Sequence, residues 1–115
     1  MFPLQLHVSI GDLPPGWLGE YVSGSIILDP TAEGDGWFVD ATDAAFALAN
    51  GQETALPGSE AAGHVDGLTV VMHEMGHALG LPDETAGVMS ESLAPGTRNL
   101  PTPADVAAAF ASGRL

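Results

Sequence analysis

The segment from His73 to Asp83, HEMGHALGLPD, constrains the fold of this chain more than any other part of it. Residues four apart lie on one face of an α-helix, so His73 and His77 can direct their imidazoles at a single cation. Glu74 follows His73 by about 100° around the helix axis, close enough to hydrogen-bond a water beside that cation. The pattern therefore predicts a helix that carries a zinc site.

A catalytic zinc needs a third protein ligand besides the two histidines, with one position left open. Gly80 can adopt the left-handed conformation that ends a helix, which turns the chain back toward the metal within three residues. Asp83 is therefore predicted to supply an oxygen ligand. Asp66 precedes the apolar run at an N-cap position, so a start and a stop signal bound the helix.

The alternative is that the two histidines are ordinary polar residues, either on a solvated helix face or satisfied within the core. Apolar residues recur at helical spacing in this segment, namely Leu68, Val71, Met72, Met75 and Leu79. His73 and His77 fall on the other side of the helix from this apolar stripe. Metal ligation therefore accounts for the pair better than core packing does.

The same residues resemble a known family. HEMGHALGLPD is similar to the extended HExxHxxGxxH/D signature of the metzincin peptidases, and GVMSES, which contains Met89, is similar to their Met-turn. The resemblance implies zinc bound by His73, His77 and Asp83. It also implies Glu74 as the catalytic base and Met89 as a hydrophobic floor beneath the metal. Most of the clan has His where this chain has Asp83.

The resemblance extends beyond the zinc segment. Residues 93–110 are similar to the closing segment and last helix of matrixin-like catalytic domains, and residues 25–29 and 36–40 look like segments of metzincin-type domains in large bacterial surface proteins. A secreted or cell-surface location is implied, although residues 1–10 lack the pattern of a signal peptide. The family's first helix has no obvious counterpart before residue 20.

The periodicity predicts one α+β domain over residues 1–115, with a small mixed sheet, the zinc-binding helix and a C-terminal helix, to which the resemblance adds the Met-turn. Strands are predicted at 4–10, 20–29 and 37–40, and a short helix at 43–50. Residues 52–63 are rich in turn formers. Thr102, Pro103 and Asp105 predict the start of the last helix, with Val106, Ala109 and Phe110 facing the core.

The charge balance excludes several classes of partner. Fifteen acidic residues oppose two basic ones, for a net charge of −13. Such a chain repels phosphate backbones and anionic headgroups, so neither nucleic acid nor a membrane surface is expected as a partner. A solvated acidic surface is the simpler interpretation. The sharper one is a calcium site built from Asp29, Glu33, Asp35, Asp40 and Asp43.

Two other features limit the chemistry. The chain has no cysteine, which excludes disulfides, thiolate zinc ligands and an inhibitory cysteine within it. His64 precedes His73 by nine residues in an expected loop. It could shuttle a proton or bind metal, but an ordinary structural role is favoured.

Three functions are compatible with these features. The first is a zinc-dependent endopeptidase, in which Glu74 transfers the proton of a metal-activated water and a peptide substrate adds to the strand at 20–29. The second is a zinc-bearing interaction or structural module of a secreted protein whose catalysis has lapsed. The third is a calcium-dependent structural domain in which HExxH is incidental. The sequence specifies no oligomeric state.

Overall fold

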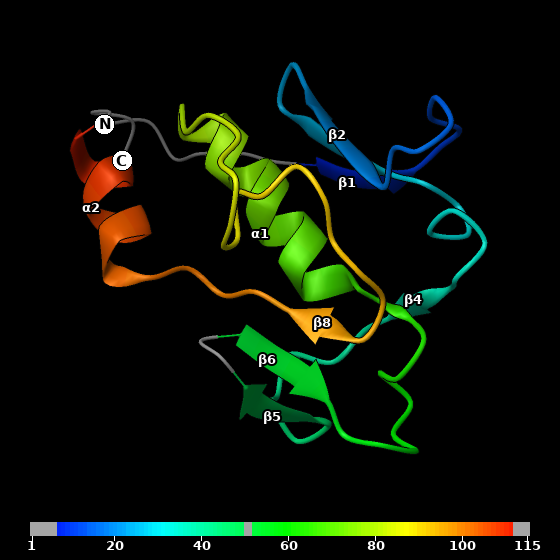
Figure 1. Cartoon of the computed structure of the whole chain (residues 1–115). Helices are drawn as coiled ribbons and strands as arrows, with labels where there is room; N and C mark the ends of the chain where they lie inside the picture. The colour runs from blue at the N-terminus through cyan, green and yellow to red at the C-terminus, as the bar shows by residue number, and fades with distance from the viewer. Residues whose placement is uncertain (1–6, 50–51, 112–115) are drawn as a thin grey trace.

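The computed structural model describes residues 7–49 and 52–111, which form an α+β fold (Figure 1). The elements in chain order are β1 (His7–Ile10), β2 (Gly19–Val22), β3 (Ser25–Leu28), β4 (Trp37–Phe38), β5 (Phe46–Ala49), β6 (Gln52–Ala55), β7 (Val65–Asp66), α1 (Gly67–Ala78), β8 (Thr97–Arg98) and α2 (Pro103–Ala111). Neither helix in these ranges is long and apolar enough to cross a membrane.

The first sheet is mixed, with the strand order β1-β3-β2. β1 pairs with β3 in parallel, and β2 pairs with β3 in antiparallel. The single strand predicted at 20–29 is therefore wrong, because the segment is a hairpin. Ser23 and Gly24 have φ angles of 48° and 84°, the left-handed conformations that reverse a two-residue β-turn.

Helix α1 packs on the face of this sheet at β2 and β3, and it runs through the middle of the molecule (Figure 1). Gly19 permits the close approach, because a Cβ there would lie 2.9 Å from Cγ1 of Val70. Between β1 and β2 the chain forms a loop over residues 11–18.

Both predicted ends of α1 are confirmed. The Asp66 carboxylate accepts from the backbone N–H of Thr69 at 3.2 Å as the N-cap, and Gly80 takes a φ of 90° just after the helix. The predicted apolar stripe is wrong in one respect, because its residues are only partly buried. The buried residues of α1 are Gly67, Thr69, Val70, Glu74, Gly76 and Ala78. Small and hydrogen-bonded residues lie inward because sheet and loop approach the helix closely.

The short helix predicted at 43–50 is also wrong. β5 pairs in antiparallel with β6, and β6 pairs in antiparallel with β8. An alanine-rich segment this short is a marginal helix by itself, so tertiary contacts decide its structure. Phe46 makes those contacts: its ring lies edge-on to Phe38 at 5.7 Å, and the Arg98 guanidinium lies 4.4 Å from its centroid.

Arg98 is fully buried and joins three parts of the chain. Its Nε and Nη2 each donate to the Asp66 carboxylate at 2.9 Å, so the guanidinium forms a bidentate hydrogen bond with the N-cap residue of α1. Nη1 donates to Thr42 O at 2.6 Å and to Asp43 Oδ1 at 3.1 Å, and Nη2 donates to Asp40 O. The N-terminal end of the helix is thereby tied to β8 and to the loop before β5.

The predicted start of α2 is confirmed. Thr102 N–H donates to the Asp105 carboxylate at 2.7 Å, and Asp105 N–H donates to Thr102 Oγ1 at 3.2 Å. Ala109 is buried as predicted, whereas Val106 is 47% exposed. The side chain of Phe110 lies outside the described part of the chain. The described part of the first strand is His7–Ile10, and residues 4–6 of the predicted strand lie outside the described part of the chain.

Candidate metal centre

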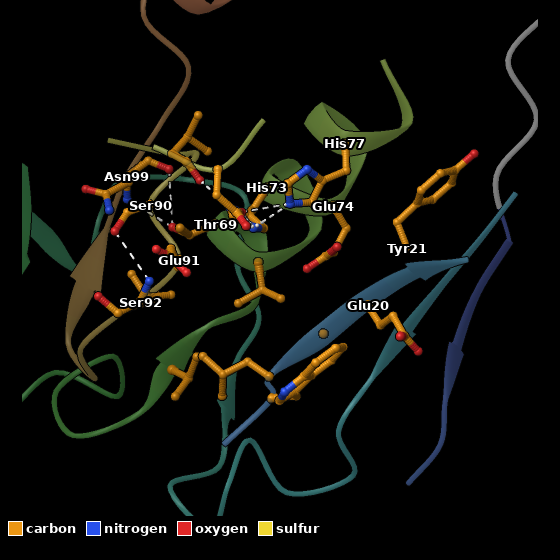
Figure 2. Close-up of a pocket in the computed structure, with 18 of the residues that line it drawn as sticks. Glu20, Tyr21, Thr69, His73, Glu74, His77, Ser90, Glu91, Ser92 and Asn99 are labelled. Atoms are coloured by element: carbon orange, nitrogen blue, oxygen red, sulfur yellow. Dashed lines mark hydrogen bonds and ion pairs between the residues drawn. The ribbon is translucent and has the colours of Figure 1, made fainter. Parts of the chain in front are cut away.

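His73 and His77 of α1 lie together beside the cavity (Figure 2), and Asp83 from the loop after the helix lies against both of them. The Nε2 atoms of His73 and His77 are 3.0 Å apart. Asp83 Oδ1 lies 3.3 Å from Nε2 of His73 and 3.0 Å from Nε2 of His77. Within residues 7–49 and 52–111, no other set of three His or carboxylate side chains is arranged to hold a metal ion.

Backbone carbonyls fix the orientation of both imidazoles. Nδ1 of His73 lies 2.9 Å from Val88 O, and Nδ1 of His77 lies 2.9 Å from Leu81 O. A carbonyl oxygen only accepts, so each Nδ1 carries the proton and donates it. When Nε2 carries no proton, each ring directs its Nε2 lone pair at the other ring and at Asp83. This is the arrangement in which an outer hydrogen bond presents histidine to a metal.

The donor set fits a zinc ion. Ligand atoms about 2.0–2.1 Å from a tetrahedral zinc lie roughly 3.3 Å from one another, close to the separations here. Two lone pairs and a carboxylate oxygen that face one another repel unless a cation or a proton lies between them. The side chains of His73 and His77 are mostly buried, whereas that of Asp83 is 48% exposed. One side of the group is therefore open to a fourth ligand.

The turn after α1 carries Asp83 to this position. Gly80 N–H donates to His77 O at 3.0 Å and Leu81 N–H donates to Gly76 O at 2.9 Å, a helix ending that needs the left-handed Gly80. Farther on, Glu84 N–H donates to Met89 O at 2.7 Å, which closes the loop. The structure thus brings together the three residues that the sequence predicts as ligands.

Glu74 lies beside this group and is only 6% exposed. Its carboxylate faces β2, since a Cβ at Gly19 would lie 3.4 Å from Glu74 Oε2. Burial raises the pKa of Glu74, while His73 and His77 and the Tyr21 backbone N–H oppose the increase. Buried between helix and strand, the carboxylate has a fixed place at the edge of the histidine pair.

Met89 packs directly against the helix backbone between the two histidines. It is 2% exposed, and a Cβ at Gly76 would lie 2.3 Å from its sulfur. Glycine inside a helix costs about 1 kcal/mol relative to alanine, so a packing reason is expected for one at this place. The methionine sulfur supplies it, because only a residue without a side chain leaves room.

A cavity of about 710 Å³ opens over the centre. Most of the lining comes from three segments: residues 16–21, the α1 residues Thr69, Val70, His73, Glu74 and His77, and a third group of residues 87–88, 90–93 and Asn99. Figure 2 shows Glu20 and Tyr21 on one side of the cavity and Ser90 to Ser92 with Asn99 on the other. The lining includes six carboxylates and no lysine or arginine: Glu20, Glu33, Asp35, Glu74, Asp83 and Glu91. A bound dication would thus enter a field that is strongly negative throughout.

The five carboxylates proposed for calcium do not gather into one group. Asp29 accepts from the backbone N–H of Glu33 at 2.9 Å, a bond that lowers the pKa of Asp29, and Asp43 pairs with Arg98. Asp40 accepts from the N–H of Thr42 at 2.8 Å. These side chains shape their own loops, so the calcium expectation has no support from the described residues.

His64 is exposed, and its Nδ1 lies 3.2 Å from the carbonyl of Ala62, apart from the histidine pair. Asn99 and Thr69, by contrast, line the cavity although sequence reasoning did not single them out. They meet across 30 residues of chain, and no local pattern reports such a contact.

Comparisons of the chain with protein-family models, with curated proteins and with solved structures find no match. The functional assignment therefore depends on the HExxH segment and on the geometry of its donors.

Proposed function

We propose that this protein is a zinc-dependent endopeptidase of the metzincin type. The observation that carries the proposal is the convergence of His73 Nε2, His77 Nε2 and Asp83 Oδ1, with both Nδ1 atoms engaged by backbone carbonyls. Neutral, oriented imidazoles and a carboxylate with an open side are what a catalytic zinc requires. A solvated pair of histidines has no need of two such carbonyl contacts.

When bound there, zinc lowers the pKa of a water toward neutrality and polarises a peptide carbonyl. Glu74 takes the proton of the attacking water and delivers it to the leaving amine as the C–N bond breaks. The carboxylate is suited to this transfer because it borders both the histidine pair and the cavity. In this proposal, Met89 is the methionine of the Met-turn and packs beneath the zinc-binding side chains of His73 and His77.

The substrate is proposed to bind along β2. Among the described residues, the strand order β1-β3-β2 leaves one edge of β2 without a partner strand, and Gly19 to Tyr21 line the cavity. An extended peptide can add to such an edge through main-chain hydrogen bonds. Since Glu74 lies against the same strand, a peptide bound there passes beside the proton acceptor.

The decisive experiment is Glu74→Gln with zinc loaded. The amide keeps the size of the side chain and removes the base, so hydrolysis of casein or of a quenched peptide should decrease at least about a hundredfold. Zinc content by elemental analysis and the far-UV circular dichroism spectrum should stay unchanged. Full activity in this variant would show that Glu74 is not the base.

A zinc-bearing interaction module is the second candidate. The loop over residues 11–18 leaves α1 as the only helix packed on the β1-β3-β2 sheet within the described chain, so the domain is reduced relative to the family pattern. A parent protein that binds one zinc and hydrolyses no peptide, with and without chelator, would favour this function over the peptidase.

A further inference from the structure

Asn99 lines the cavity above the metal centre, on the side away from Glu20 and Tyr21 (Figure 2). A second cavity of about 260 Å³ adjoins the first on the side of β6 and β8. The two cavities share part of their lining, namely Gly87, Ser90, Ser92, Leu93 and Asn99. These residues therefore form the partition between them, and among the five Asn99 has the largest hydrogen-bonding side chain.

The side chain of Asn99 is held from both sides. Its Nδ2 donates to Gly87 O at 3.3 Å, and its Oδ1 accepts from Gln52 Nε2 at 3.1 Å. Its backbone N–H donates to Thr69 Oγ1 at 3.0 Å, which fixes the residue against α1. The residue is 9% exposed. The amide thus connects the loop above the centre to β6 and closes the space between them.

We propose that Asn99 sets the length of the substrate side chain that the cleft accepts on this side of the metal. The inference rests on the proposed peptidase function. A short side chain fits in front of the amide. A long one must displace it, which breaks its bonds to Gly87 and Gln52 and leaves buried polar groups without partners. The parent therefore selects short side chains at one position beside the cleaved bond.

Shortening Asn99 removes the partition. Asn99→Ala deletes the amide and joins the two cavities, while the contact between Thr69 and the backbone of residue 99 is retained. Asn99→Ser does the same with a smaller loss of polarity and guards against a fold that does not tolerate alanine. Gln52→Ala is the matched control, because it removes one partner of Asn99 from the second cavity and leaves the amide in place.

The test is cleavage of a complex peptide library by the zinc-loaded parent and the three variants, with the residues beside each cleaved bond identified by mass spectrometry. Asn99→Ala and Asn99→Ser should admit Met, Phe and Tyr at a position where the parent admits Ala and Ser, with at least a tenfold change in the ratio of kcat/KM for a matched peptide pair. Gln52→Ala leaves the amide in place and removes only one of its two bonds, so its profile should shift less than that of either Asn99 variant.

A binding measurement separates the pocket from the chemistry. Heptapeptides with a central Ala or a central homophenylalanine are titrated into zinc-loaded Glu74→Gln and Glu74→Gln/Asn99→Ala proteins, and only the second protein should gain affinity for the long side chain. Unchanged profiles and affinities in a protein that binds zinc and peptide would overturn this inference alone, as would a Gln52→Ala profile equal to that of Asn99→Ala. A parent that binds neither zinc nor peptide overturns the proposed function and the inference together.

Discussion

The two ends of α1 gather ionisable side chains in opposite ways. At the N-terminal end, the Arg98 guanidinium lies among the carboxylates of Asp66 and Asp43 and donates to all its partners within the chain. At the C-terminal end, His73, His77 and Asp83 direct acceptor atoms at one another, and neither Lys nor Arg lines the cavity around them. The N-terminal end contains its own cation, Arg98, whereas the C-terminal end holds the three side chains proposed to bind zinc.

This difference separates structural charge from functional charge. A buried ion pair with its hydrogen bonds completed has no site left for a ligand, and it stabilises one arrangement of the surrounding loops. Acceptors that face one another without a donor interact unfavourably until a cation or a proton lies between them. Similar residue types thus serve the fold at one end of the helix and the proposed chemistry at the other.

The largest expected effect is at the N-terminal end. Arg98→Met removes the guanidinium and leaves Asp66 buried and unpaired, so the free energy of unfolding should fall by about 3–5 kcal/mol. Urea denaturation followed by circular dichroism measures the loss, and added zinc should not restore the parent stability. Asp43→Asn is the control, because Asp43 is 55% exposed and should matter far less. Equal losses in the two variants would contradict the assigned role of Arg98.

Removal of zinc should have the next largest effect. A ligand at a hundred times its Kd stabilises the native state by about 2.7 kcal/mol, so excess chelator should lower the melting temperature of the zinc-loaded parent. Asp83→Ala should lose zinc affinity and most of this chelator effect, whereas Asp83→His should keep both, because imidazole also binds zinc. An unchanged melting temperature after verified zinc removal would show that the C-terminal end of α1 does not depend on a bound cation, and would contradict the proposed difference between the two ends of the helix.

A smaller loss of stability is expected when the contact between Met89 and Gly76 beneath the two histidines is disturbed. Gly76→Ala places a Cβ where the Met89 sulfur lies and should destabilise the protein by roughly 1–3 kcal/mol through overpacking. The same clash should also lower the zinc affinity of Gly76→Ala by displacing the histidines. The double variant Gly76→Ala with Met89→Ala removes the clash and should regain part of that affinity. If the single variant binds zinc and melts like the parent, the methionine is not a rigid support.

The smallest expected effect on stability comes from the carboxylate of Glu53, which lies near Arg98. Glu53 lies opposite Arg98 in the β6–β8 register, and its Oε2 is buried without a hydrogen-bond partner. Burial raises the pKa of Glu53 above its ordinary value of 4.5, and Asp43 adds to the increase. The folded state then binds this proton more tightly than the unfolded chain, so the stabilising contribution is present below about pH 4.5 and lost as the pH rises through the raised value.

Glu53→Gln should therefore melt at a slightly higher temperature than the parent at neutral pH, with the difference shrinking toward pH 4. Melting curves between pH 4 and pH 8 check the direction, and Glu60→Gln, at an exposed position, serves as the control. A parent that gains more stability than the variant as the pH rises would reverse the sign and exclude the explanation.

The sequence predicted the parts of this molecule that depend on short-range rules. The limits of α1 followed from Asp66 and Gly80, the start of α2 followed from Thr102 and Asp105, and the spacing of the zinc segment identified the residues that the structure brings together. Each of these features is decided by hydrogen bonds between residues a few positions apart.

One error, the hairpin missed within residues 20–29, depended on the local turn at Ser23 and Gly24. The other errors occur where contacts between distant residues decide the structure. The segment around Phe46 has helix-forming alanines but becomes a strand because Phe38 and Arg98 bind its aromatic ring. The inward face of α1 is polar and small because a strand and a loop press on it, and neither is visible in helical periodicity. The Asn99 partition was missed for the same reason, since its partners lie 12 to 47 residues away.

Gly19 shows how little of such a site needs to change for its use to be lost. A methyl group at this position would meet Cγ1 of Val70 at 2.9 Å and push β2 away from the helix, although neither residue is a metal donor. The distance between β2 and the helix that carries His73 and His77 thus depends on the lack of a Cβ at Gly19. With alanine at this position, the three proposed zinc ligands would be unchanged in sequence, but β2, the proposed peptide-binding strand, would have to shift relative to the helix.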